Sequence, residues 1–240
     1  FKPYEIRPFN MLERVLTQPR VLFFYLSLIA VPMTSRMAIL HDIEISRALW
    51  TPWTTSAAMA ALLGSVIILL AVSRRYPLLS FCGLFFFLNH AVEGSVLNLE
   101  LIYEHRNYIP SMLLFVPIAI AAVKSYDYFS YQRAFQRTIA ASILLFLVSQ
   151  SYTTWTYNRV FQSELSLWLH TAGRSPGLSV VRSNLGNVYW AMGLHEQALK
   201  QFLAAHELNR FNNSLQRGHL LYNLGLYDAY EKKSYDKALE

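Results

Sequence analysis

Three titratable side chains, Glu104, His105 and Arg106, stand side by side between two long apolar stretches. The forked guanidinium of an arginine can hold a phosphate through two parallel hydrogen bonds. A glutamate next to it can orient the guanidinium or a sugar hydroxyl, and a histidine can relay a proton near neutral pH. These three residues, with Tyr108 close behind them, are therefore our candidates for binding a lipid-linked phosphate or its sugar.

A second and weaker set of candidates lies upstream, at His90, Glu93 and Glu100. If one helix continued from Phe81 through the connection, its step of about 100° would bring Glu93, Glu100 and Glu104 into one narrow stripe, with His90 nearby. Carboxylates on one helix face are costly near lipid. Such a stripe should therefore line a polar cavity or pair with cations.

A purely structural role for these residues is the alternative to a binding site. Gly94 can break the helix, which would remove the stripe, and His90 with Glu93 then forms a buried hydrogen-bonded pair one turn apart. Asn107 would cap the next helix, and Pro110 would occupy its first turn. The segment would be a salt-bridged turn between two membrane helices.

Composition indicates the medium around these side chains. Hydrophobic residues make up 54% of the 240 residues and charged residues only 15%, and the mean hydropathy of +0.25 is unusual for a soluble domain of this length. Charged residues are sparse over 54–123, whereas the chain after Tyr157 is as polar as an ordinary globular domain. We expect a membrane part joined to a soluble part. No basic stripe interleaved with aromatic residues occurs, so nucleic acid is not an expected partner.

Four apolar stretches are long enough to cross a bilayer, which takes about 20 residues per helix. They cover residues 54–73, 78–97, 108–123 and 138–157. Basic residues gather in the first and third connections, at Arg74, Arg75, Lys124, Arg133 and Arg137. The positive-inside rule places these connections in the cytoplasm, so residues 104–106 and everything after Tyr157 are predicted to face outward.

The N-terminal part is harder to orient. Its apolar run 21–33 is short for a span and favours an interfacial or re-entrant helix, although a further span stays open. We therefore expect residues 1–53 to form an extracytoplasmic or interfacial segment and residues 54–157 to form four transmembrane helices. Because the chain opens without an initiator Met and stops within a helical pattern, it reads as an internal segment of something longer.

The soluble part, 158–240, resembles tetratricopeptide repeats. The stretch 183–209 has the small and large residues of that repeat at its own spacing: Leu185, Gly186, Tyr189, Ala198, Phe202 and Ala205. The first repeat would cover about 179–212. A second, incomplete one contains Leu224 and Ala238, with an insertion between the two, and further repeats are expected. The predicted fold is all-α, a multipass helical membrane domain followed by an α-solenoid.

Tetratricopeptide repeats bind extended peptides or partner helices on a concave surface. Asn184, Asn187 and Asn223 are our candidates for holding a peptide backbone through their amides, with Asn184 and Asn223 preceding a Leu-Gly pair in each unit. The simpler alternative is that these asparagines lie on a solvated face.

Multipass segments followed by outward repeats, joined near one short motif, resemble the transmembrane and TPR-containing O-mannosyltransferases and their bacterial relatives. These are membrane glycosyltransferases of the C-type fold. The motif consists of Glu104, Arg106, Tyr108, Pro110 and Ser111, with 12–26 as further support. The eukaryotic members have the Glu and Arg adjacent, whereas His105 separates them here.

The resemblance implies transfer of a sugar from a polyprenyl-phosphate carrier to a protein hydroxyl on the outer side, with the repeats binding the acceptor. It also places the catalytic base in a first outer loop, which this chain lacks, so we name no catalytic residue. The protein would be a multipass protein of the bacterial inner membrane. The alternative is a non-catalytic, membrane-anchored repeat scaffold for extracytoplasmic assembly.

A metal is not required by either interpretation. The run His41 to Glu44 has suitable ligand atoms but no further partner, so it is more typical of a solvated loop. No cofactor is therefore predicted, although use of a divalent metal stays open.

Overall fold

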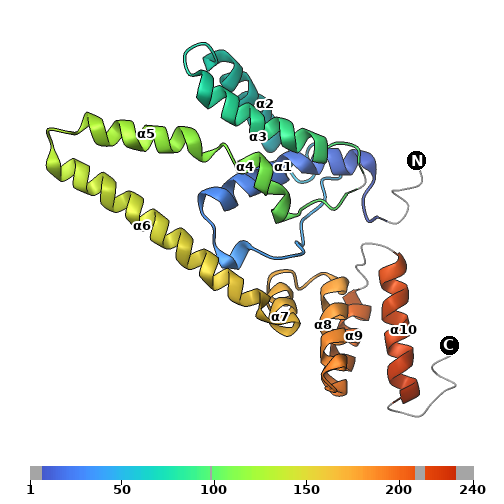
Figure 1. Ribbon diagram of the computed structural model, residues 1–240. Helices are drawn as coiled ribbons and strands as arrows, with labels where there is room; N and C mark the ends of the chain where they lie inside the picture. Colours follow the sequence, from blue (N-terminus) through green and yellow to red (C-terminus); the bar gives the residue numbers. More distant parts are fainter. Residues whose placement is uncertain (1–6, 98, 209–213, 231–240) are drawn as a thin grey trace. The chain divides into compact units, whose positions relative to one another are not determined.

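The computed structural model describes residues 7–97, 99–208 and 214–230, and these residues form helices and connections without a β-strand (Figure 1). The predicted all-α class is confirmed. The main helices are α1 (Met11–Ala30), α2 (Thr54–Val72), α3 (Pro77–Glu93), α4 (Tyr108–Ser111), α5 (Phe115–Tyr128), α6 (Arg133–Asn158), α7 (Glu164–Arg174), α8 (Ser179–Ala191), α9 (His195–Leu208) and α10 (Ser214–Tyr230). The chain divides into two compact units. The predicted division at residues 53 and 157 stays a prediction.

The first unit combines Met11–Thr34 with Glu44–Thr156. Its core is the packing of α1, α2 and α3. A short turn joins α2 to α3, so the two helices run antiparallel, and the Ser80 hydroxyl donates to the carbonyl of Leu69 at 2.6 Å. The apolar run predicted at 21–33 belongs to α1, which begins ten residues earlier, at Met11, and ends before Pro32.

Helix α2 is apolar around its whole circumference and buries only Thr55. Among the described residues it is the one helix that is by itself long and apolar enough to cross a membrane. The pair Glu104–Ser111 and Phe115–Tyr128 meets the same criterion only when taken together, with a bend of 56°. One or two helices could therefore span a membrane, and the arrangement with four spans stays a prediction.

Two of the predicted spans differ from an unbroken transmembrane helix. Over 108–123, α4 ends at Ser111 and α5 begins at Phe115, with the backbone N–H groups of Met112 and Leu114 bonding to carbonyls three residues back. Pro117, in the first turn of α5, has no N–H to bond the carbonyl of Leu113, which favours this break. Helix α6 covers the fourth stretch with 26 residues, but a polar run at 149–154 lowers its hydropathy.

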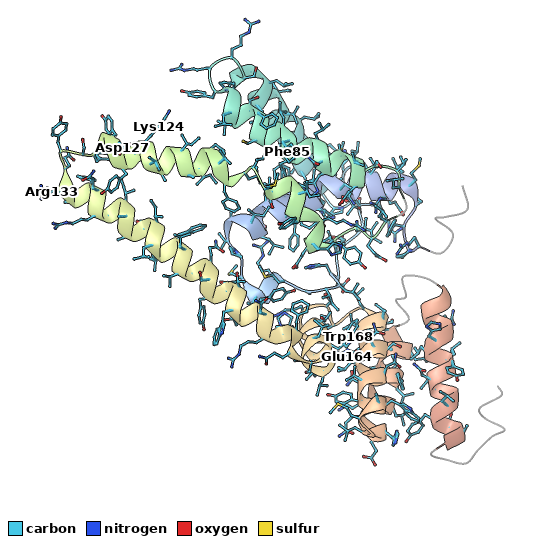
Figure 2. The ribbon with its side chains drawn as sticks, in the orientation of Figure 1. Phe85, Lys124, Asp127, Arg133, Glu164 and Trp168 are labelled. Carbon is cyan, nitrogen blue, oxygen red and sulfur yellow. The ribbon has the colours of Figure 1, made fainter. Side chains whose placement is uncertain are left out.

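Helices α5 and α6 bury no side chain. Lys124 and Asp127 near the end of α5 and Arg133 at the start of α6 lie around the turn between them (Figure 2). This turn is the third connection, to which the sequence assigns cytoplasmic basic residues.

The second unit contains Ser35–Ile43 and the chain from Tyr157 onward. Ser163 caps α7 through a reciprocal pair of hydrogen bonds with Ser166. At the other end of α7, the Ser175 hydroxyl donates to the carbonyl of Leu40 at 2.7 Å and accepts from the N–H of Asp42 at 3.2 Å. These bonds fix part of the predicted 1–53 segment to the helices of this unit.

Helices α8 and α9 form a tight hairpin whose turn contains Gly193 with φ of 75°. Ala198, Phe202 and Ala205 of α9 are buried with Leu220 of α10. These three α9 residues occupy signature positions of the predicted repeat, but the tetratricopeptide assignment itself stays a prediction. Part of the predicted insertion is helical, because α10 begins at Ser214. The Ala238 position of the second repeat lies outside the described residues.

Gly186 permits the close approach of α8 to α9. A Cβ atom at Gly186 would lie 2.5 Å from Cε1 of Phe202, whose ring is fully buried. We expect Gly186→Ala to lower the free energy of unfolding by about 1–3 kcal/mol, because the buried ring would have to shift against the side chains packed around it. Gly173→Ala in α7 is the matched control, since nothing lies within 4 Å of its Cβ. Thermal unfolding of both variants checks this, and equal midpoints would contradict the close contact.

Candidate functional site

The site is built on a buried arginine of α1. The Arg14 side chain has no exposed surface. Its guanidinium donates to the carbonyls of Glu93 at 2.7 Å, Ser95 at 3.2 Å and Glu100 at 3.4 Å, and also to that of Leu99. Because α3 ends at Glu93, the last carbonyls of the helix need donors from outside it. Arg14 supplies the donor for the carbonyl of Glu93, and its other bonds fix the connection that follows.

Tyr25, three turns further along α1, holds the next part of this connection. Its hydroxyl accepts from the N–H of Tyr103 at 2.7 Å and donates to the carbonyl of the same residue at 3.1 Å. Its ring stacks on His90, with 5.4 Å between the ring centroids. Burial raises the pKa of Tyr25 to about 12, although the bond with the Tyr103 backbone acts in the opposite direction. The phenol therefore stays a neutral donor at physiological pH.

Arg14 and Tyr25 hold the connection that carries the candidate site, and the sequence alone did not single them out. Gln18 lies between them, and its amide donates to the carbonyl of Leu101 at 3.4 Å. Gln18 follows Arg14 by four residues and precedes Tyr25 by seven, so all three side chains share one helix face. Polar side chains on one face of an apolar helix are the signal that could have found them.

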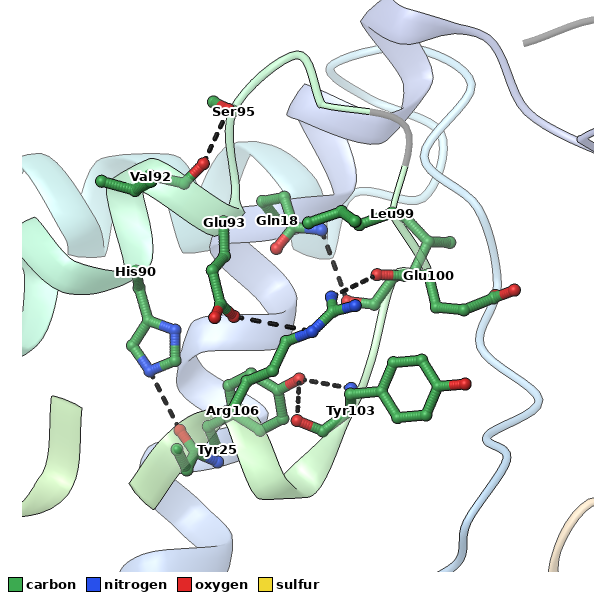
Figure 3. Close-up of polar contacts among 12 residues, drawn as sticks. Gln18, Tyr25, His90, Val92, Glu93, Ser95, Leu99, Glu100, Tyr103 and Arg106 are labelled. Atoms are coloured by element: carbon green, nitrogen blue, oxygen red, sulfur yellow. Dashed lines mark hydrogen bonds and ion pairs between the residues drawn. The ribbon is translucent and has the colours of Figure 1, made fainter. Parts of the chain in front are cut away.

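Arg106 lies in the short 3-10 helix η3 (Glu104–Asn107), directly before α4. Its Nη1 donates to the carbonyl of Glu100 at 3.0 Å, and its Nε lies 3.7 Å from Oε2 of Glu93 (Figure 3). The guanidinium also lies over the ring of Tyr103, 4.8 Å from the centroid. Since the Arg106 side chain is 16% exposed and that of Glu93 is 38% exposed, the pair lies at the edge of the protein surface.

The local geometry differs from two of the predictions. The stripe of three glutamates is wrong, because α3 ends at Glu93 and the N–H of Gly94 bonds to the carbonyl of His90 at 2.7 Å. The predicted pairing of His90 with Glu93 is also wrong. His90 instead bonds to Oδ1 of Asn107 at 2.9 Å (Figure 3), so the Asn107 side chain does not cap α4.

The remaining candidates divide by exposure. His105 is exposed, with its ring 4.9 Å from that of Tyr103, and Tyr108 is 82% exposed. Glu104 is half-buried. The structure therefore brings Arg106 together with Glu93 and the backbone of Glu100, and leaves His105 and Tyr108 exposed.

An apolar groove of about 780 Å³ has His90 and Gly94, which adjoin this cluster, in its lining. It is formed by α1, α2 and α3, and its lining includes Leu22, Leu62, Val66, Leu84, Phe85 and Leu88; Phe85 is labelled in Figure 2. The polar side chains of the lining are Gln18 and His90. His90 bonds to Asn107, the residue next to Arg106. The groove is therefore linked to Arg106 through His90 and Asn107, and Arg106 itself does not line it.

The second candidate site lies on α8 and α10. The Asn223 amide donates to Oδ1 of Asn187 at 2.6 Å, so these two of the three predicted peptide-binding residues are in contact. Asn187 is exposed and Asn184 is half-buried.

Metal binding finds no support in the part of the chain that the structure describes. No group of three or more His, Cys, Asp or Glu side chains there could hold an ion. This includes His41, Asp42 and Glu44.

None of the protein families, curated proteins or solved structures compared with the chain matches it.

Proposed function

We propose that this chain is part of a membrane glycosyltransferase that uses a sugar carried on polyprenyl phosphate and transfers it to a hydroxyl of a protein. The groove of α1–α3 would hold the prenyl chain, and Arg106 would bind the phosphate. The helices α7–α10, as tetratricopeptide repeats, would bind the acceptor. The observation that carries the proposal is the apolar groove with His90 in its lining. The His90 ring bonds to Asn107, the residue directly after Arg106.

The electrostatics suit this role. Arg14 is fully buried and directed at backbone carbonyls, so of the two arginines that bond to this connection Arg106 is the one closer to the surface. Its contact with the Glu93 carboxylate is long, at 3.7 Å, so an incoming phosphate could replace Glu93 with shorter, bidentate bonds. Glu104 and His105 would orient the sugar or relay a proton, and the catalytic base would come from another part of the protein.

The test of this function is sugar transfer by membranes that contain the complete protein. Labelled polyprenyl-phosphate sugars are supplied, and label is measured on envelope protein. We expect Leu88→Trp, which fills the groove, to raise KM for the donor about 10-fold, equivalent to about 1.4 kcal/mol. Ile67→Trp is the control, because Ile67 is similarly exposed on α2 but does not line the groove. Equal KM values in both variants would exclude the groove from donor binding.

The second candidate function is a non-catalytic repeat scaffold anchored in the membrane. The bond between Asn187 and Asn223 on an accessible surface favours protein binding by α8 and α10, whatever the membrane part does. The same assay separates the candidates, since a scaffold would consume no donor and would still retain its partner.

The proposal also includes a topology, with four spans in the bacterial inner membrane and α7–α10 outside. We expect a cysteine at Gln197 of α9, in a Cys82→Ala background, to react with an impermeant thiol reagent in intact cells. Both Gln197 and Ser130, in the turn between α5 and α6, are exposed. Ser130→Cys is therefore the matched control and should react only after lysis. The reverse pattern would overturn the proposed orientation.

The Tyr25 hydroxyl provides a further prediction for the site. We expect Tyr25→Phe to lower the free energy of unfolding by about 1–3 kcal/mol, because both polar groups of the Tyr103 backbone lose their partner. Tyr76→Phe is the control, since Tyr76 is 50% exposed. Denaturation in detergent measures both, and equal losses would contradict the role of Tyr25.

The pH dependence of the parent protein follows from the same hydroxyl. Folding raises the pKa of Tyr25 above its ordinary value of 10, so the folded state holds this proton more tightly than the unfolded state does. The resulting stability is fully present below pH 10 and is lost as the pH rises toward 12. Tyr25→Phe should lack this component, and an identical alkaline profile of parent and variant would argue against it.

A further inference from the structure

One end of the α2–α3 hairpin gathers three segments that are far apart in sequence. Helix α2 begins there at Thr54, and α3 ends there at Glu93, since the two helices run antiparallel. The first turns of α1 lie at the same end. Glu13 pairs with Arg47 at 2.7 Å, and Arg14 donates to the carbonyl of Glu93.

Each of these segments exposes large apolar side chains. The exposed fraction is 63% for Leu12, 76% for Trp50, 69% for Trp53 and 50% for Leu97. With Met11 and Leu49, which are exposed by 50% and 47%, we name these six residues the interfacial patch.

The turn that carries the tryptophans has a well-paired backbone. The N–H groups of Arg47 and Ala48 donate to the carbonyl of Thr51, and the N–H of Thr51 donates to the carbonyl of Ala48. The N–H of Ser56 donates to the carbonyl of Leu49. A turn paired in this way can enter a medium of low polarity at little cost, because few backbone groups lose hydrogen bonds to water.

A network of polar side chains under this turn holds it in place. The Thr17 hydroxyl accepts from the N–H of Ser46 at 3.0 Å, and the hydroxyls of Ser46 and Thr55 are 2.7 Å apart. Arg20 donates to the carbonyl of Glu44 at 2.8 Å. The exposed tryptophans are therefore presented by a fixed support on α1 and α2.

We propose that the interfacial patch lies in the headgroup layer of a phospholipid bilayer and holds α1 and the adjacent Arg106 site at that depth. Tryptophan favours this layer because its ring is apolar and its N–H is polar. The two tryptophans of the patch directly precede α2, the helix suited to crossing a membrane, and Arg74 and Arg75 lie at the opposite end of the hairpin. The inference rests on the membrane part of the proposed function.

The experiment places the complete protein in phosphatidylcholine vesicles with a single tryptophan. One variant keeps only Trp50 and another keeps only Trp53, with the other tryptophans replaced by Phe. Lipids brominated either near the headgroup or near the bilayer centre then quench the fluorescence. We expect both variants to lose most fluorescence with shallow bromine and less with deep bromine. A variant that keeps only Trp190, a half-buried residue of α8, should lose none.

Two results would overturn the inference. Emission typical of water that neither lipid quenches would mean that the patch faces solvent, and blue-shifted emission that neither lipid quenches would mean that protein covers it. Alkaline extraction of the same vesicles then shows whether only the position of the patch is wrong or the membrane part of the proposed function is wrong as well. If the chain stays with the lipid, only the patch is wrong, whereas release of the chain contradicts both.

Discussion

Replacing Arg14 by methionine is expected to lower the free energy of unfolding by about 3 kcal/mol or more. Four backbone carbonyls, from Glu93 to Glu100, accept hydrogen bonds from this one buried side chain. Each buried polar group that loses its partner costs about 1–3 kcal/mol. Removing Arg14 also removes the cost of burying its charge. The expected loss of stability is therefore well below the sum of the costs of four unpaired carbonyls. Chemical unfolding in detergent measures it.

The matched control for Arg14 is on the same helix. Arg20 is only half-buried and donates to the carbonyl of Glu44 and the hydroxyl of Ser46, so Arg20→Met should cost about 1 kcal/mol. Limited proteolysis adds a second measurement, because loss of Arg14 should expose the connection 94–101 to cleavage. If the two variants were equally stable and equally resistant, Arg14 would not be the residue that holds this connection.

Arg106→Lys is expected to reduce sugar transfer, as kcat/KM for the donor, by about 10- to 100-fold. Lysine keeps the charge but cannot form two parallel bonds to a phosphate. Hydrogen bonds to charged groups contribute about 1.5–3 kcal/mol, and about 1.4 kcal/mol corresponds to a factor of ten. The loss should appear mainly in KM if Arg106 binds the carrier phosphate equally in the ground state and the transition state.

Arg47→Lys provides the comparison for Arg106→Lys. Arg47 also pairs with a glutamate, Glu13, but its side chain is 56% exposed, against 16% for Arg106. Transfer should be unchanged in this variant. The stability of the Arg106 variant must stay close to that of the parent, as measured by thermal unfolding. Unchanged transfer in Arg106→Lys would remove this residue from the site and favour the scaffold.

Most helix positions could be predicted from the sequence because they depend on local hydropathy. Helix α2 begins at Thr54, where the apolar run begins. The end of α3 could not be placed with the same certainty. Gly94 was compatible with either a break or a continuous helix, and the bonds from Arg14 that fix the break come from about 80 residues away in sequence.

The candidate site was predictable only in part for the same reason. Arg106 and Glu93 were recognised as charged residues in an apolar setting, and the structure pairs them. The bond between His90 and Asn107 could not be predicted, because nothing in a run of residues shows which of several polar neighbours a histidine will reach. The polar face of α1 could have indicated Arg14 and Tyr25, but their partners could not be predicted, because these are backbone groups far away in the sequence.

The bonds of Arg14 also have a consequence for biosynthesis. Its acceptors at Ser95 and Glu100 follow it by 81 and 86 residues. At a synthesis rate of about 5–20 residues per second, α1 would exist for roughly 4–16 s before its partners emerge. During that time the guanidinium needs water or another protein as its partner. We therefore expect α2 and α3 to form their hairpin first and α1 to join it afterwards.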